Sequence, residues 1–107
     1  MELILEGIIG NMGKAEGIAK VIEKERDLDD FKEGQILISK HTTPLYVIAF
    51  GKAKAIVTDI GGLTAHAAIL ARELGIPCMV GTGKATQVIK TGDKVLVDAN
   101  EGKIYKL

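Results

Sequence analysis

The stretch from Ala55 to Gly81 constrains the fold more than any other part of the chain, because it combines a strand, a glycine turn, a helix and a second strand. Ala55–Asp59 ("AIVTD") is a short, nearly all-apolar run, typical of a central strand buried on both faces. Gly61 and Gly62 follow as a turn, and residues 76–81 ("IPCMVG") form another apolar run. The pattern predicts a strand and helix unit within a sheet.

A helix is predicted from Thr64 to Leu74. Thr64 is a suitable N-cap, the segment is rich in alanine and leucine, and Gly75 is typical of a helix end. At about 100° per residue, four apolar side chains fall on one stripe: Ala67, Leu70, Ala71 and Leu74. His66 lies at the edge of this stripe. Ile69 lies off it, which indicates either a second covered side of the helix or a surface for a partner.

Short strands separated by turn residues dominate the rest of the chain. Branched apolar residues predict strands at 3–9 and 17–22, which are expected to form a hairpin-like pair. The other expected elements are an exposed connection with one helical turn at 23–30, a turn at 32–34, a strand at 35–39, a helix that begins at Thr43 and Pro44 and ends near Gly51, a turn with a helix start at 81–86, and a terminal hairpin around Gly102. This order favours an α/β fold with a mixed sheet and packed helices.

Composition limits the class of protein. With 107 residues and 47% hydrophobic content, the chain is expected to form a single domain, 1–107, with a small core. Lys plus Arg equals Asp plus Glu at 14 each, so neither nucleic acid nor an anionic membrane is an expected partner. Since no secretion signal or membrane span of roughly 20 apolar residues is visible, a cytoplasmic location is expected. Cys78, the one cysteine, is expected to be a buried structural thiol.

His66 stands where a helix N-terminus would present it to an anion. If Thr64 caps the helix, His66 lies in the first turn, among unpaired backbone N–H groups and the positive end of the helix dipole. Gly61 and Gly62 remove side-chain bulk and permit the tight turn that aims N–H groups at a phosphate. The positive helix end also favours the neutral imidazole, whose lone pair can attack a phosphoryl group. The same N–H groups and the Thr64 hydroxyl would then hold that group.

Simpler structural roles compete with this interpretation. A histidine near a helix start is more often a surface or capping residue than a catalyst. Arg72 points away from His66 along the helix, so a salt bridge competes with a phosphate contact. His41 has no metal-ligand spacing to a second histidine or cysteine and is assigned no role. Lys52 and Lys54 are expected on a solvated face, or against an acidic partner surface.

The segment at 61–83 ("GGLTAHAAILARELGIPCMVGTG") resembles the phosphohistidine segment of the PEP-utilising enzymes, which include phosphoenolpyruvate synthase, pyruvate phosphate dikinase and enzyme I of the sugar phosphotransferase system. The residues in register with that motif are Gly61, Gly62, Thr64, His66, Ala67, Ala68 and Arg72. The resemblance extends over 31–105. It implies the swivelling β/β/α fold of a mobile domain that carries a phosphoryl group between a nucleotide site and a phosphoenolpyruvate/pyruvate site. By position, His66 is the phosphorylated residue.

The chain departs from the large relatives in size, because 107 residues leave no room for their ATP-binding and barrel domains. The resemblance therefore implies separate partners: an ATP-grasp-type nucleotide-binding protein and a PEP/pyruvate-binding barrel protein. We expect no cofactor on this chain, with Mg and ATP or phosphoenolpyruvate on the partner subunits. "GTGKAT" lacks the Walker spacing. No metal site is expected either, since Asp59, Asp93 and Asp98 are explained as strand-end or turn residues.

Two classes of function follow. The first is a free-standing phosphohistidine carrier, a phosphotransferase component of a split phosphoenolpyruvate synthase- or dikinase-like system. The second is a non-catalytic binding or regulatory module that retains the fold; the presence of His66, Thr64 and both glycines argues against it. An excised piece of a larger protein is a third possibility, although Met1 and the terminal hairpin favour a stand-alone chain.

Overall fold

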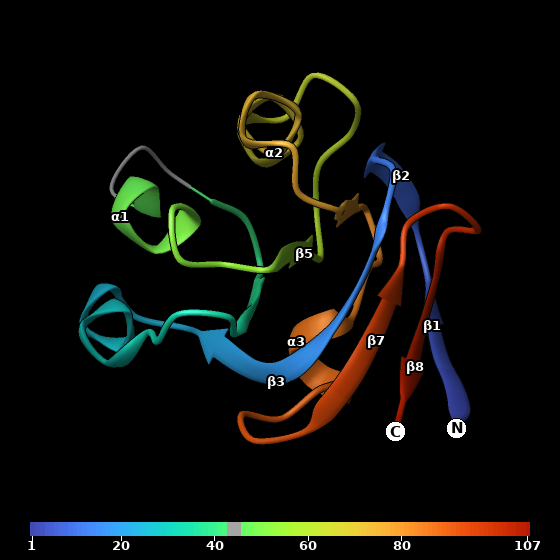
Figure 1. The fold of residues 1–107 in the computed structure, drawn as a ribbon, viewed down its shortest axis with the longest axis horizontal. Coiled ribbons are helices and arrows are strands. Elements are labelled where there is room, and N and C mark those ends of the chain that lie inside the picture. Colours follow the sequence, from blue (N-terminus) through green and yellow to red (C-terminus); the bar gives the residue numbers. More distant parts are fainter. Residues whose placement is uncertain (43–45) are drawn as a thin grey trace.

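Eight strands form one mixed sheet in the computed structural model, which describes residues 1–42 and 46–107 (Figure 1). The strand order is β1-β8-β7-β3-β4-β5-β6-β2. The strands are β1 (Glu2–Glu6), β2 (Ile8–Asn11), β3 (Lys14–Ile22), β4 (Ile36–Ser39), β5 (Ala55–Thr58), β6 (Cys78–Val80), β7 (Lys94–Asp98) and β8 (Lys103–Lys106). The helices are the 3-10 helix η1 (Glu25–Asp30) and the α-helices α1 (Val47–Phe50), α2 (His66–Leu74) and α3 (Ala85–Val88). None of these helices has the length and apolar character of a membrane-crossing segment.

The parallel centre of the sheet is buried on both faces. Strands β3 to β6 run parallel, and every residue of β4, β5 and β6 is buried. Because successive side chains of a strand point to opposite faces, Ile36 and Ile38 lie in one apolar cluster and Leu37 lies in the other. The central strand predicted at 55–59 is confirmed, and its continuous apolar run is explained by this double burial.

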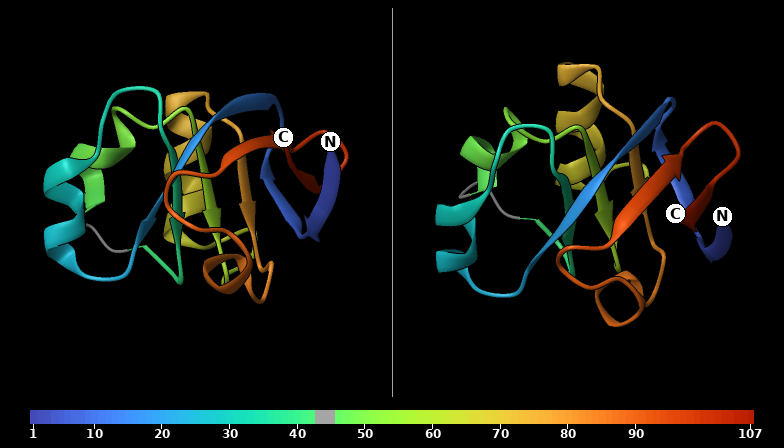
Figure 2. Two further views of the ribbon diagram at one scale, coloured as in Figure 1. Left: turned by 90° about the horizontal axis from the view of Figure 1, so that it is seen from below. Right: turned by 60° about the horizontal axis from the view of Figure 1, so that its bottom comes forward.

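The two buried faces give the molecule three layers. On one face, β1, β7, β8 and α3 pack over the parallel strands; on the other, α1 and α2 cover them (Figures 1 and 2). The long strand β3 belongs to both strand layers, because residues 14–18 pair with antiparallel β7 and residues 19–22 pair with parallel β4. This arrangement confirms the expected α/β class, with a mixed sheet and packed helices in a β/β/α order.

The N-terminal strands pair differently from the prediction. The segment at 3–9 divides at Gly7 into β1 and β2; β1 pairs with β8 and β2 pairs with β6. The predicted hairpin-like pair with β3 is therefore wrong, because pairing with strands far along the chain overrides the local turn signals. Gly7 joins the two sheet edges: its N–H donates to the Gly102 carbonyl at 3.1 Å, and a Cβ there would lie 2.8 Å from the Thr82 side chain.

The remaining expected elements are confirmed where the structure describes them. The terminal hairpin is β7–β8, with Gly102 at φ +72°, and α2 ends at Gly75, also at φ +72°. Helix α1 ends next to Gly51, as expected. Its predicted start at Thr43 and Pro44 lies outside the described residues.

Candidate functional site

His66 is the first residue of α2, beyond the carboxyl end of β5. Its side chain is half-buried, and its ring centroid lies 5.9 Å from that of Phe50 on α1. Thr42 Oγ1 lies 3.4 Å from His66 Nδ1. One ring nitrogen is thus held against the protein, whereas Nε2, on the opposite side of the ring, is not used by this contact.

The helix begins one residue later than predicted. Ala65, not Thr64, is the N-cap, and no side chain caps the helix. The Ala65 N–H donates to the Gly62 carbonyl at 3.0 Å, which closes a turn that contains Thr64 and leaves this residue exposed. Within the described residues, the backbone N–H groups of residues 66–68 have no acceptor. These are the groups that a helix leaves open at its N-terminus, so His66 stands beside open amides as expected.

The two glycines before the helix are not equivalent. Gly61 has φ +124°, and a Cβ there would lie 3.0 Å from the Ala65 Cβ. A side chain at this position would therefore meet both backbone strain and a close contact. A Cβ at Gly62 would meet open space. The expectation that the turn needs a glycine is thus supported at Gly61 and not at Gly62.

A hollow of about 140 Å³ lies beside the His66 ring. Its lining includes Gly61 and, from the segment after β4, His41 and Thr42. Neither Gly62 nor Thr64 lines it. From the sequence, His41 has no assigned role, and Thr42 is not among the predicted site residues. The signal that points to both is topological, because the carboxyl ends of adjacent parallel strands, here β4 and β5, meet at one edge of the sheet.

Arg72 holds the loop before the helix through hydrogen bonds to backbone carbonyls. Its Nε donates to the Gly10 carbonyl of β2 at 3.0 Å, and its second guanidinium nitrogen donates to the Leu63 carbonyl. Within the described residues no carboxylate pairs with it. Arg72 thus connects α2, the edge strand β2 and the turn that leads to His66.

The buried face of α2 is rotated from the predicted stripe. Ala67, Ala68 and Ala71 are buried, Leu70 packs partly, and Leu74 is 48% exposed. Ala68 is buried because α2 packs closely against β2 at Gly10, which has no side chain. A Cβ at Gly10 would lie only 3.1 Å from the Ala68 Cβ. Ile69, 43% exposed, lies on the outer side of the helix.

Other candidate groups have structural partners. Cys78 is fully buried, as expected, and burial raises the pKa of its thiol to about 12. Asp59 accepts hydrogen bonds from the backbone N–H and hydroxyl of Thr86, which joins the loop after β5 to α3. Lys54 is exposed, and its Nζ donates to the Glu16 carbonyl. Within residues 1–42 and 46–107, no group of three metal-ligating side chains comes together.

Comparison with known families agrees with this geometry. The family model described as "PEP-utilising enzyme, mobile domain" matches residues 31–102. The phosphoenolpyruvate synthase of Pyrococcus furiosus is 50% identical over 105 residues, which cover 98% of this chain and 13% of that protein. The chain thus spans about one-eighth of the length of the curated relatives it matches.

Solved structures show the same fold. An NMR structure of enzyme I superposes with a TM-score of 0.64 at 38% identity, over 74% of this chain and 33% of that one. A crystal structure of Thermococcus kodakaraensis aconitase X superposes with a TM-score of 0.74, over 96% of this chain and 97% of that one. Its 24% identity supports a likeness of fold alone.

Proposed function

The chain belongs to the family of PEP-utilising enzyme mobile domains, and on this premise we propose that His66 accepts a phosphoryl group from one partner and donates it to another. The observation that carries the proposal is the placement of His66 at the first position of α2, beside open backbone N–H groups and a hollow. An imidazole in an anion-binding place suits nucleophilic attack on a phosphoryl group.

The ring contact selects the reacting nitrogen. In the proposal, Nδ1 carries the ring proton and donates a hydrogen bond to Thr42 Oγ1, which leaves the Nε2 lone pair free. Nε2 attacks the phosphorus of the donor, an N–P bond forms, and the bond from phosphorus to the donor oxygen breaks with its electron pair on that oxygen. Attack by an acceptor oxygen on the same phosphorus returns the electron pair to Nε2.

Backbone groups hold the transferred group in this proposal. The N–H groups of residues 66–68 can donate hydrogen bonds to the phosphoryl oxygens, and they lie at the positive end of the helix dipole. Both effects stabilise the charge of a phosphate. Gly61 keeps the hollow open on the side of the loop. Thr64, with an exposed side chain before the helix, is proposed as a further hydroxyl donor, and Gly62 as a backbone neighbour that leaves space for the phosphoryl group.

Partners complete the reaction. A phosphoryl carrier needs a donor site and an acceptor site, and we propose that an ATP-grasp-type nucleotide-binding protein and a PEP/pyruvate-binding barrel protein supply them in a split system. Mg and ATP or phosphoenolpyruvate would be bound by those partners. Positioned metal and charge supply most of the catalysis in phosphoryl transfer, so ATP or phosphoenolpyruvate alone should leave the chain unmodified.

Intact-mass spectrometry tests the proposal. The chain is incubated with Mg, ATP or phosphoenolpyruvate, and a lysate of the organism that makes it. We expect the mass gain of one acid-labile phosphoryl group, mapped by fragmentation to His66 and absent from His66→Gln. Since the chain has two histidines, an adduct on His41, or none in any condition, would overturn the proposal. Thermal unfolding of His66→Gln checks that the variant is folded.

A further inference from the structure

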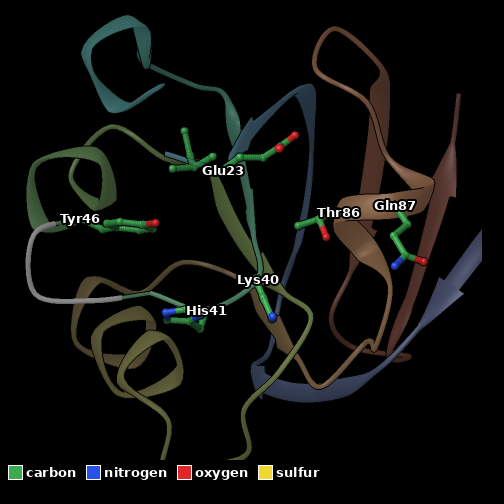
Figure 3. Close-up of a pocket in the computed structure, with 7 residues that line it drawn as sticks. Glu23, Lys40, His41, Tyr46, Thr86 and Gln87 are labelled. Atoms are coloured by element: carbon green, nitrogen blue, oxygen red, sulfur yellow. The ribbon is translucent and has the colours of Figure 1, made fainter. Parts of the chain in front are cut away.

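A second, larger hollow lies beside the His66 site, at the carboxyl ends of β3 and β4 (Figure 3). Its volume is about 420 Å³, within the range of small-molecule sites. Its lining includes Ile22, Glu23, Lys40, His41, Tyr46 and Gln87. His41 lines this hollow and also the smaller one that contains His66. Carboxyl ends of parallel strands are where sheets of this kind place ligands.

One side of the hollow is suited to an anion. Lys40 and His41 are consecutive, exposed and adjacent in Figure 3. Within the described residues Lys40 forms no ion pair. An ammonium group and an imidazole N–H can both donate to a phosphate group, and hydrogen bonds to a charged acceptor are the stronger kind.

An apolar surface adjoins this cationic side. Tyr46 is half-buried and Ile22 is 2% exposed. Burial raises the pKa of the Tyr46 phenol, and the charges of Asp27 and Glu25 add to that rise, so the hydroxyl stays protonated and can donate. A flat ring face beside an aliphatic side chain suits a planar heterocycle.

The opposite side of the hollow carries an acceptor. Figure 3 shows Glu23 across the hollow from His41, and Gln87 on α3 forms part of the wall. A carboxylate only accepts hydrogen bonds, so Glu23 favours a ligand N–H and repels a second anionic group. The hollow thus has a cationic end, an apolar middle and an anionic end.

We propose that this hollow binds a nucleoside 5′-monophosphate whose base carries an amino group. The phosphate lies against Lys40 and His41, the base stacks on Tyr46, and the amino group donates to Glu23. This binding site goes beyond the phosphoryl-carrier function and does not depend on it.

An NMR titration of the ¹⁵N-labelled chain tests the proposal, with AMP as the probe. We expect saturable shifts confined to residues 22–23, 40–42, 46 and 86–87. Adenosine, which lacks the phosphate, and IMP, which lacks the amino group, should each bind about tenfold more weakly than AMP. Inorganic phosphate should not reproduce the shifts.

Two variants separate the site from general charge effects. Lys40→Gln should raise the Kd for AMP about tenfold, whereas Lys52→Gln, an exposed lysine at the opposite ends of the strands, should leave it unchanged. Glu23→Gln should reduce the preference for AMP over IMP. Shifts that do not saturate, shifts that lie elsewhere, or a Lys40→Gln variant that binds AMP as tightly as the parent chain would overturn the proposal.

Discussion

The antiparallel half of the sheet (β1, β7 and β8) and the parallel half (β3 to β6) differ in their connections. The difference lies in whether the backbone N–H groups of a connection find hydrogen-bond acceptors. In the antiparallel half, the turn between β7 and β8 is closed internally, because Asp98 Oδ1 accepts from the N–H groups of Asn100 and Glu101. In the parallel half, the connection after β5 ends at residues 66–68, whose N–H groups have no acceptor among the described residues. A hairpin can satisfy its own turn, whereas a parallel crossover leaves a helix N-terminus at the sheet edge.

The two kinds of connection also differ in the sequence separation of the residues that they bring together. Hairpin strands bring together residues that are close in sequence, as in the pairing of Asp98 with Lys103. The parallel strands bring together Thr42 and His66, which are 24 residues apart. In the proposed function, the parallel half therefore carries the chemistry of His66 and the antiparallel half supports it. Substitutions in each half can break this division.

The largest expected effect comes from a substitution that opens a cavity in the antiparallel half. It should lower the stability of the chain but leave the rate at which His66 accepts a phosphoryl group unchanged. Ile104 of β8 is fully buried, so Ile104→Ala should lower the free energy of unfolding by about 2–5 kcal/mol. Leu3→Ala, on the neighbouring strand and 45% exposed, is the matched control and should cost much less. Denaturant unfolding measures both. The division would fail if Ile104→Ala, assayed while fully folded, accepted phosphoryl groups more slowly.

A smaller effect is expected from the glycine pair in the parallel half. Gly61→Ala should cost about 1–3 kcal/mol, because a non-glycine residue at φ +124° is strained and the new Cβ would crowd Ala65. It should also slow formation of the His66 adduct. Gly62→Ala should change the free energy of unfolding by about 0.5 kcal/mol or less, since its Cβ would meet open space. Equal effects of the two substitutions would contradict this assignment.

Local sequence patterns predict the parts of the fold that depend on local structure. The strand at 55–58, the end of α2 at Gly75 and the β7–β8 hairpin follow from apolar runs and glycine positions. The pairing of β1 and β2 does not, because each pairs with a strand more than 60 residues away. No local pattern encodes which distant edge a strand joins.

The same limit applies to the site. His66 and Gly61 are predictable, because helix N-terminus chemistry and positive φ are local properties. Thr42 and His41 are not, since they reach His66 only through the pairing of β4 with β5. The rotation of the α2 face also escapes prediction, because it depends on Gly10 of β2 lying against Ala68.

The next effect concerns an ionisable group in the core of the parallel half. The Cys78 thiol has its pKa raised by burial from 9.0 to about 12. Below pH 9 the thiol is protonated in the folded and in the unfolded chain. Above pH 9 the unfolded chain loses this proton first, so the free energy of unfolding decreases as the pH rises toward 12. At pH 10 the loss should be about 1 kcal/mol relative to pH 8.

Lysines and tyrosines also titrate in this pH range. The effect of the thiol is therefore measured as the difference between the parent chain and a variant that lacks it. Denaturant unfolding of the parent chain and of Cys78→Ala at pH 8 and pH 10 isolates the thiol. We expect the parent chain to lose about 1 kcal/mol more than the variant. Parallel losses in both proteins would show that the thiol ionises equally in the folded and unfolded chains.

The smallest effect tests the contact between Thr42, in the segment after β4, and His66, in the segment after β5. Thr42→Val keeps the shape of the side chain but removes the hydroxyl that contacts His66 Nδ1 at 3.4 Å. Because one neutral hydrogen bond contributes about 0.5–1.5 kcal/mol, adduct formation should slow by about two- to tenfold. Thr42→Ser restores the hydroxyl and should restore the rate, whereas loss of packing alone would make serine no better than valine. Unchanged rates in both variants would show that Thr42 does not orient the ring.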